Sequence, residues 1–187
     1  MAPKPVNDGE NRELNAPDDA QPSSVLVLLF PNRKEQWELT LTLRSHDIDH
    51  GGQISFPGGR SEPGEEIART ALREAEEEIG VPSDTVEIIG QLSKLYISPS
   101  NNIVSPVVGA LKARPDFIIN PAEVEEVFAI ELDSLLHKKN LTVEDWELEN
   151  YKYRVPYWDI HRVPLWGATA MMLNEFLDLY REFRDGG

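Results

Sequence analysis

Four glutamates crowd into five consecutive residues of the segment REAEEEIG, which spans 73–80. On a helix, Glu74 and Glu78 lie one turn apart, and like charges at that spacing cost roughly 0.2–0.5 kcal/mol. A hard divalent cation reverses this cost, because it prefers clustered carboxylate oxygens and also binds substrate phosphates. The segment therefore indicates metal-assisted chemistry.

A helical wheel shows that the four glutamates are not equivalent. Counting 100° per residue from Ile67, the apolar side chains fill an arc of about 140°, as on a helix that packs against a core. This predicted core face consists of Ile67, Ala68, Ala71, Leu72, Ala75 and Ile79. Glu74 and Glu78 fall at its edge, with Glu77 one step further out. A solvated acidic face accounts for Glu76, which points elsewhere, but accounts poorly for the pair at the edge.

Strands must position this helix. The run SSVLVLLF at 23–30 is typical of a buried strand, and WELTLTLR at 37–44 alternates like a half-buried one. The turn Pro31–Lys34 between them predicts a hairpin. The loop 50–66 contains five glycines, so its backbone can approach other groups closely.

Further strands and a second helix follow. Strands are predicted over 86–98, 103–112 and 151–158, and 123–136 is predicted to be a strand leading into a helical turn. The segment 167–183 predicts a helix whose apolar stripe belongs to the core. That stripe consists of Met172, Leu173, Phe176, Leu177, Tyr180 and Phe183. This order of elements favours a mixed sheet covered by helices.

Composition favours one globular domain over 24–187, after a polar, flexible N-terminal tail over 1–23. The 187 residues contain no cysteine, which excludes thiolate metal ligands, and no apolar run of membrane-spanning length. Lys and Arg total 18 against 33 Asp and Glu, and the net charge of −15 disfavours nucleic-acid binding. We therefore expect a cytoplasmic protein that binds neither membranes nor nucleic acid.

The segment 59–81 resembles the Nudix box, because every fixed position of that 23-residue pattern is filled. The resemblance implies a Nudix-type α/β/α sandwich with a mixed β-sheet, and hydrolysis of a diphosphate linked to another group. It also implies Mg²⁺ or Mn²⁺ as cofactor, with Glu74 and Glu78 as the main metal ligands. Glu77 would be a further ligand, or the catalytic group that orients or deprotonates water.

The same resemblance implies roles for three other residues. Gly58, just before the box, would offer its carbonyl to a metal. Arg73 and Glu65 would hold the helix and loops in place through charge-assisted hydrogen bonds. Ala75 departs from the family pattern, because that position often carries a larger aliphatic residue.

A second motif, LTLRSHDIDHGGQISFPGG at 41–59, is similar to the signature upstream of the box in coenzyme A diphosphatases. Three later segments also resemble that subfamily: 98–109, 120–128 and 165–177. Arg44 and Gln53 are the implied substrate-binding residues, and the planar guanidinium of Arg44 suits either phosphate oxygens or a carboxylate partner. The spacer between them is one residue shorter than in the subfamily, which puts the substrate contacts of this loop in question.

Three alternatives stay open. His46 and His50 have the spacing of zinc ligands on a helix, although the glycines that follow leave little room for one. The chain could also be a Nudix module that senses a nucleotide without cleaving it, or a hydrolase of ADP-ribose, a dinucleotide or a nucleoside triphosphate. Trp146, Trp158 and Trp166 could stack on an adenine or pack within the protein. The expected partner is a small nucleotide diphosphate substrate, and a homodimer is left open.

Overall fold

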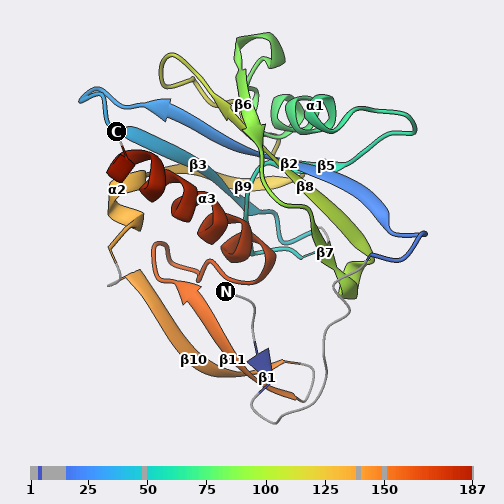
Figure 1. The fold of residues 1–187 in the computed structure, drawn as a ribbon. Coiled ribbons are helices and arrows are strands. Elements are labelled where there is room, and N and C mark those ends of the chain that lie inside the picture. Colours follow the sequence, from blue (N-terminus) through green and yellow to red (C-terminus); the bar gives the residue numbers. More distant parts are fainter. Residues whose placement is uncertain (1–3, 6–15, 48–49, 138–139, 149–150, 187) are drawn as a thin grey trace.

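The structure, a computed structural model, describes residues 4–5, 16–47, 50–137, 140–148 and 151–186. Within these ranges, a mixed sheet of eight strands forms the centre of the molecule (Figure 1). Its strands are β2 (Gln21–Pro31), β3 (Trp37–Arg44), β4 (Ile54–Ser55), β5 (Gly58–Arg60), β6 (Glu87–Gln91), β7 (Leu95–Ile97), β8 (Asn102–Ala110) and β9 (Val124–Glu131). β2 and β8 run parallel, whereas the other described pairs are antiparallel.

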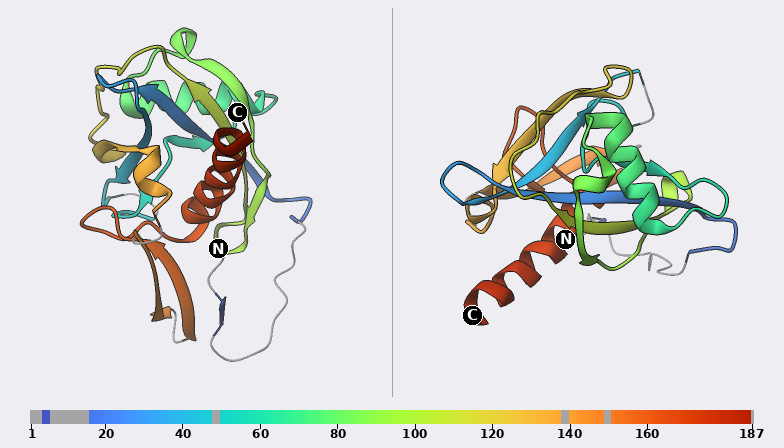
Figure 2. Two further views of the ribbon diagram at one scale, coloured as in Figure 1. Left: turned by 60° about the vertical axis from the view of Figure 1, so that its left-hand side comes forward. Right: turned by 90° about the horizontal axis from the view of Figure 1, so that it is seen from above.

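Helices cover both faces of this sheet. They are α1 (Ile67–Ile79), α2 (Leu132–Leu135) and α3 (Gly167–Gly186), with 3-10 turns at Ser83–Thr85 and Ser98–Ser100. α1 lies on one face and α3 on the other (Figure 2). Residues of β2 alternate between the two cores, since Leu28 packs beside α1 and its neighbours Val27 and Leu29 pack beside α3. The predicted α/β/α sandwich with a mixed sheet is confirmed.

Strand β3 is more buried than predicted. It pairs antiparallel with β2, which confirms the hairpin. However, Thr40 and Thr42 are at most 1% exposed, like the leucines on either side of each of them. A central strand in a sheet that is covered on both faces is buried on both sides. The buried Thr42 hydroxyl satisfies its hydrogen-bonding capacity without water, because its Oγ1 donates to the Ser55 carbonyl at 3.2 Å.

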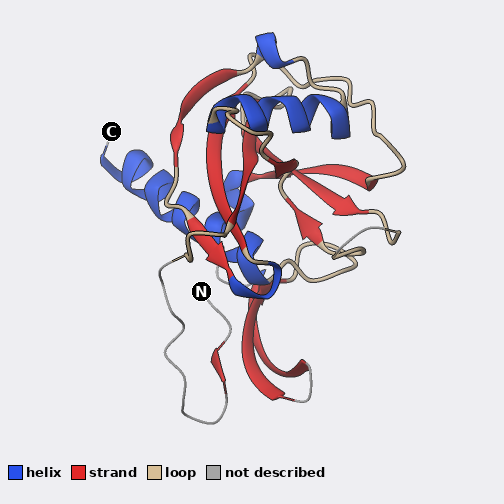
Figure 3. Ribbon diagram, turned by 90° about the vertical axis from the view of Figure 1, so that its right-hand side faces the viewer, coloured by secondary structure: helices blue, strands red, loops and turns tan. Residues whose placement is uncertain are grey.

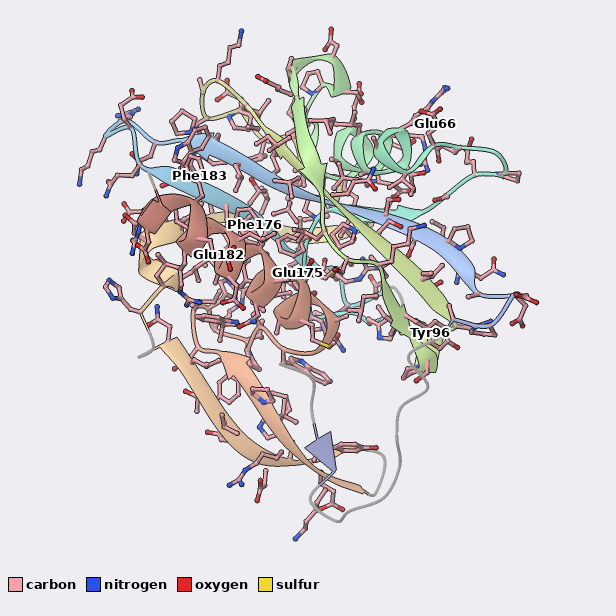
Figure 4. The ribbon with its side chains drawn as sticks, viewed as in Figure 1. Glu66, Tyr96, Glu175, Phe176, Glu182 and Phe183 are labelled. Atoms are coloured by element: carbon pink, nitrogen blue, oxygen red, sulfur yellow. The ribbon has the colours of Figure 1, made fainter. Side chains whose placement is uncertain are left out.

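Three further predictions of elements need correction. The segment 86–98 forms two strands, β6 and β7, and the Ser93 N–H between them donates to Glu175 of α3 at 2.8 Å. Phe176 is 7% exposed, but Phe183, two turns later on α3, is 80% exposed and does not join the core (Figure 4). The strand β10 (Leu141–Leu148) was not predicted, because its apolar alternation is interrupted in the middle by Glu144 and Asp145.

A second, smaller sheet extends away from the first (Figure 3). It contains β1 (Lys4–Pro5), β11 (Tyr151–Trp158) and β10, in the order β1-β11-β10. Trp146 of β10 packs against Trp166, just before α3, with ring centroids 5.3 Å apart. Trp158 is 3% exposed. These contacts indicate that the tryptophans pack the hairpin β10–β11 against the body of the protein.

The predicted N-terminal tail, 1–23, overlaps strands of both sheets. Lys4–Pro5 pairs with β11 and β2 begins at Gln21, while 6–15 lie outside the described residues. None of the helices that the structure describes is long and apolar enough to cross a membrane.

Candidate active site

Helix α1 turns the predicted face to the core. Ala71, Ala75 and Ile79 are at most 1% exposed and pack in the core between α1 and the sheet. The helix ends at Gly80, whose φ of 70° lies in the left-handed region that favours glycine. Its N–H donates to the carbonyl of Glu76 at 3.0 Å. The buried face fixes the direction in which each glutamate of α1 points.

Three carboxylates meet at one edge of α1. They belong to Glu74, Glu78 and Glu123, and one oxygen from each lies within 4.8 Å of the others. Glu78 is only 3% exposed, and burial raises its pKa to about 7. Burial also raises the pKa of Glu74. Burial and mutual repulsion both disfavour the charged carboxylates, so a bound cation would stabilise them. We call these three residues the carboxylate group.

Two glycines of β5 allow the carboxylate group to form. The Gly58 N–H donates to Glu78 Oε2 at 3.0 Å. A Cβ at Gly59 would lie 2.3 Å from Glu74 Oε2, closer than the two atoms can approach. A larger residue at 59 would therefore displace the Glu74 carboxylate from the place it occupies beside β5. The carbonyl of Gly58 as a metal ligand stays a prediction.

Arg73 connects the loop before α1 to the carboxylates. Its Nε and Nη2 donate to Glu65 at 2.9 and 3.0 Å. Its Nη1 donates to Glu74 Oε1 at 2.8 Å and to Glu77 Oε2 at 3.1 Å. The Arg73 guanidinium holds the pKa of Glu65 at about 2, below its ordinary value of 4.5. These bonds agree with the structural roles expected of Arg73 and Glu65.

The other two glutamates of α1 lie outside the carboxylate group. Glu76 points away, as the wheel predicted, and its Oε2 accepts from the Ser83 N–H at 3.1 Å and hydroxyl at 2.6 Å. Glu77 is exposed over 55% of its side chain and is held by Arg73. The structure does not bring the carboxylate of Glu77 together with those of Glu74 and Glu78, so its role as a ligand stays a prediction.

Glu123 is the member of the carboxylate group that the sequence analysis missed. It lies outside the box-like segment 59–81, directly before β9. The chain reaches the site because it covers the end of α1, where the Asn120 N–H donates to the Glu78 carbonyl at 2.9 Å. The available signal was the resemblance of 120–128 to coenzyme A diphosphatases, since that segment contains Glu123.

The two predicted substrate-binding residues lie beside each other. Arg44 ends β3, and its N–H donates to the Gln53 carbonyl at 3.0 Å, while the Gly52 N–H donates back to the Arg44 carbonyl at 3.0 Å. Burial raises the pKa of Glu78, and the positive charge of Arg44 partly opposes that effect. The structure therefore brings Arg44 and Gln53 together through their backbones, and the charge of Arg44 acts on Glu78 of the carboxylate group.

The alternative zinc site is not supported by the described residues. His46 lies in a turn, is 77% exposed at its side chain, and its Nε2 is 3.5 Å from Glu125 Oε2. His50 has a φ of 58° and also lies in a turn, while 48–49 lie outside the described residues. Without a helix through the described part of this segment, no shared helix face brings the two imidazoles together.

The chemistry of the carboxylate group fits a divalent cation. All three side chains offer oxygen donors, which hard divalent cations such as Mg²⁺ prefer. They come from a helix and from the chain that caps it, so their backbones are held in place. Glu74, Glu78 and Glu123 are therefore the residues that would hold a metal ion.

Comparison with known proteins supports the same family as the sequence motif. A model of the family described as NUDIX domain matches residues 20–165. Nudix hydrolase 3 of Caenorhabditis elegans is 34% identical over 182 residues, which covers 86% of this chain and 75% of that protein. An uncharacterized Nudix hydrolase, NudL, of Photorhabdus laumondii is 36% identical over 151 residues and covers 80% of each chain.

Solved structures share the fold at lower identity. A binary complex of the C. elegans Ap4A hydrolase has a TM-score of 0.59 and 16% identity, covering 86% of this chain and 98% of that one. The M. smegmatis Nudix hydrolase RenU has a TM-score of 0.55 and 18% identity, covering 62% and 73%. The fold and the match to the family over most of the chain lead to one conclusion: this protein belongs to the Nudix hydrolase family.

Proposed function

We propose that this protein uses water to split the diphosphate of coenzyme A or of one of its derivatives. The products are 4′-phosphopantetheine, or its acyl form, and adenosine 3′,5′-bisphosphate. One observation carries the proposal: the motif 41–59 and the box-like segment meet at one place. Gly58 of that motif donates its N–H to Glu78 Oε2 at 3.0 Å, and the Arg44 N–H of the same motif donates to the Gln53 carbonyl at 3.0 Å.

We propose Mg²⁺ or Mn²⁺ as the cofactor, held by Glu74, Glu78 and Glu123. When bound, the cation would supply Lewis-acid stabilisation of the negative charge that develops on the diphosphate. Two features support this assignment, namely the all-oxygen donor set and the burial of Glu78 at 3% exposure. Burial without a cation is costly for a carboxylate, and a bound cation offsets that cost.

The residues of the chain have separate tasks in this reaction. Arg44 binds a phosphate of the substrate through its planar guanidinium. Glu77, exposed and held by Arg73, accepts a proton from the attacking water at a carboxylate oxygen. The water oxygen bonds to one phosphorus, and the bond from that phosphorus to the bridging oxygen breaks. The bridging oxygen then leaves with the other phosphate.

The test is to incubate the protein with Mg²⁺ or Mn²⁺ and a panel of substrates, and to identify the products by mass. The panel contains coenzyme A, its acylated and oxidised forms, ADP-ribose, a dinucleotide and a nucleoside triphosphate. We expect the two named products from coenzyme A or a derivative. Cleavage of ADP-ribose without cleavage of any coenzyme A form would assign the protein to another Nudix activity. Binding without any product would favour a sensor.

A further inference from the structure

Asn120 contacts the carboxylate group from two sides without belonging to it. Its backbone N–H donates to the carbonyl of Glu78 at 2.9 Å. Its side-chain Nδ2 donates to Glu123 Oε1 at 3.0 Å. A single residue therefore connects the helix that carries Glu74 and Glu78 to the side chain of Glu123, which comes from a different part of the sequence.

The orientation of the Asn120 side chain is fixed by its other bonds. Its Oδ1 accepts from the Ala122 N–H at 3.2 Å, and its carbonyl accepts from the N–H groups of Glu123 at 3.0 Å and Val124 at 2.9 Å. If the amide were flipped, its oxygen would face the Glu123 carboxylate and both bonds would be lost. Asparagine is suited to this place because it offers a donor and an acceptor on one short side chain.

The carboxylate group creates a need for such a contact. The three carboxylates lie within 4.8 Å of one another, and like charges at this distance repel. Glu74 and Glu78 are held in place by hydrogen bonds from Arg73 and Gly58. For Glu123, the amide of Asn120 provides a corresponding bond, which opposes the tendency of its side chain to turn away from the other two.

We propose that Asn120 is a positioning residue, which holds Glu123 in the carboxylate group before a cation binds. The inference rests on the proposed metal site. Partners that hydrogen-bond to metal ligands typically contribute about 10–100-fold to metal affinity. Asn120→Ala should therefore weaken Mn²⁺ binding by about that factor.

The test is a calorimetric titration of the metal-free protein with Mn²⁺, without substrate. Asn32→Ala is the matched control, because Asn32 makes the same kind of contacts far from the site. Its Oδ1 accepts from the N–H groups of Lys34 at 2.8 Å and Gln36 at 3.1 Å, and its Nδ2 donates to Glu131 at 3.4 Å. We expect comparable losses of thermal stability in chelator from the two substitutions, and a loss of Mn²⁺ affinity only from Asn120→Ala.

A double-substitution cycle separates positioning from a general structural effect. If Asn120 acts through Glu123, the protein with Asn120→Ala and Glu123→Gln should bind Mn²⁺ as Glu123→Gln alone does. Additive losses, or an Asn120→Ala affinity within two-fold of wild type, would overturn the inference. Unchanged Mn²⁺ affinity in Glu123→Gln would overturn both the inference and the metal site. Normal Mn²⁺ binding without cleavage of coenzyme A would overturn only the proposed substrate.

Discussion

Glu76 and Glu77 are neighbours on α1 with the same charge, and both are exposed, yet their surroundings differ. Glu76 accepts hydrogen bonds from Ser83, on the side away from the carboxylate group. Glu77 accepts from Arg73, whose Nη1 also donates to Glu74. The two glutamates therefore form a matched pair for mutation, because residue type, helix and exposure are the same and only the neighbourhood changes.

At this scale we predict that Glu77→Gln lowers kcat by about 10²-fold or more, because it removes the group proposed to take the proton of the attacking water. Glu76→Gln should leave kcat within about three-fold of wild type, since Ser83 and not the substrate is its partner. Steady-state kinetics of wild type and both variants under saturating metal measure these changes in kcat. Equal losses of kcat would contradict the separate roles of the two residues.

At the scale of elements, local periodicity predicted α1, its core face and the hairpin of β2 and β3. The rest depends on contacts between distant parts of the chain. β10 becomes a strand because it pairs with β11 over its whole length. Glu123 reaches the site because the chain before β9 covers the end of α1. Phe183 has the helical spacing of a core residue, but its exposure depends on how far α3 extends beyond its packed part.

The ion pair between Arg73 of α1 and Glu65 of the preceding loop leads to a prediction of pH dependence. Arg73 lowers the pKa of Glu65 from 4.5 to about 2, so the folded state favours the ionised form. The resulting stabilisation is fully present above pH about 5 and is lost as the pH falls toward the folded-state pKa. Glu65→Gln should cost about 1–3 kcal/mol at pH 7, since it weakens hydrogen bonds to a charged group.

Urea unfolding of wild type and Glu65→Gln at several pH values measures this effect. The difference in unfolding free energy should be constant from pH 7 to about 5 and should shrink below that. A difference of the same size at pH 7 and at about pH 3 would show that the ion pair with Arg73 is not its source.

At the scale of the whole molecule, the negative charge of the protein and of the site opposes binding of the proposed, negatively charged substrate. The chain carries a net charge of −15, and the site gathers three carboxylates within 4.8 Å. A diphosphate would be repelled by this field unless positive charge stood between them. Arg44 and Arg73 supply some, but Arg73 is already bonded to Glu65, Glu74 and Glu77. Binding of the substrate should therefore depend on a cation in the carboxylate group.

The stability of the whole protein should also depend on whether a cation occupies the carboxylate group. In Glu78→Gln, the amide oxygen can still accept from the Gly58 N–H, while a buried negative charge beside Glu74 and Glu123 is removed. We predict that this variant loses most activity, yet is as stable as wild type without metal, or more stable by about 0.2–0.5 kcal/mol. Glu76→Gln, which removes a charge elsewhere on α1, is the control.

Bound metal should stabilise the wild-type protein, because a ligand that binds only the folded state raises the melting temperature. We expect Mg²⁺ or Mn²⁺ to raise the melting temperature of wild type and of Glu76→Gln, and to raise that of Glu78→Gln less. Thermal melts in chelator and in excess metal measure all three proteins. If Glu78 were only a salt-bridge partner of a nearby cation, Glu78→Gln would lower the stability in chelator, and metal would leave the wild-type melting temperature unchanged. That pair of results would refute the metal site.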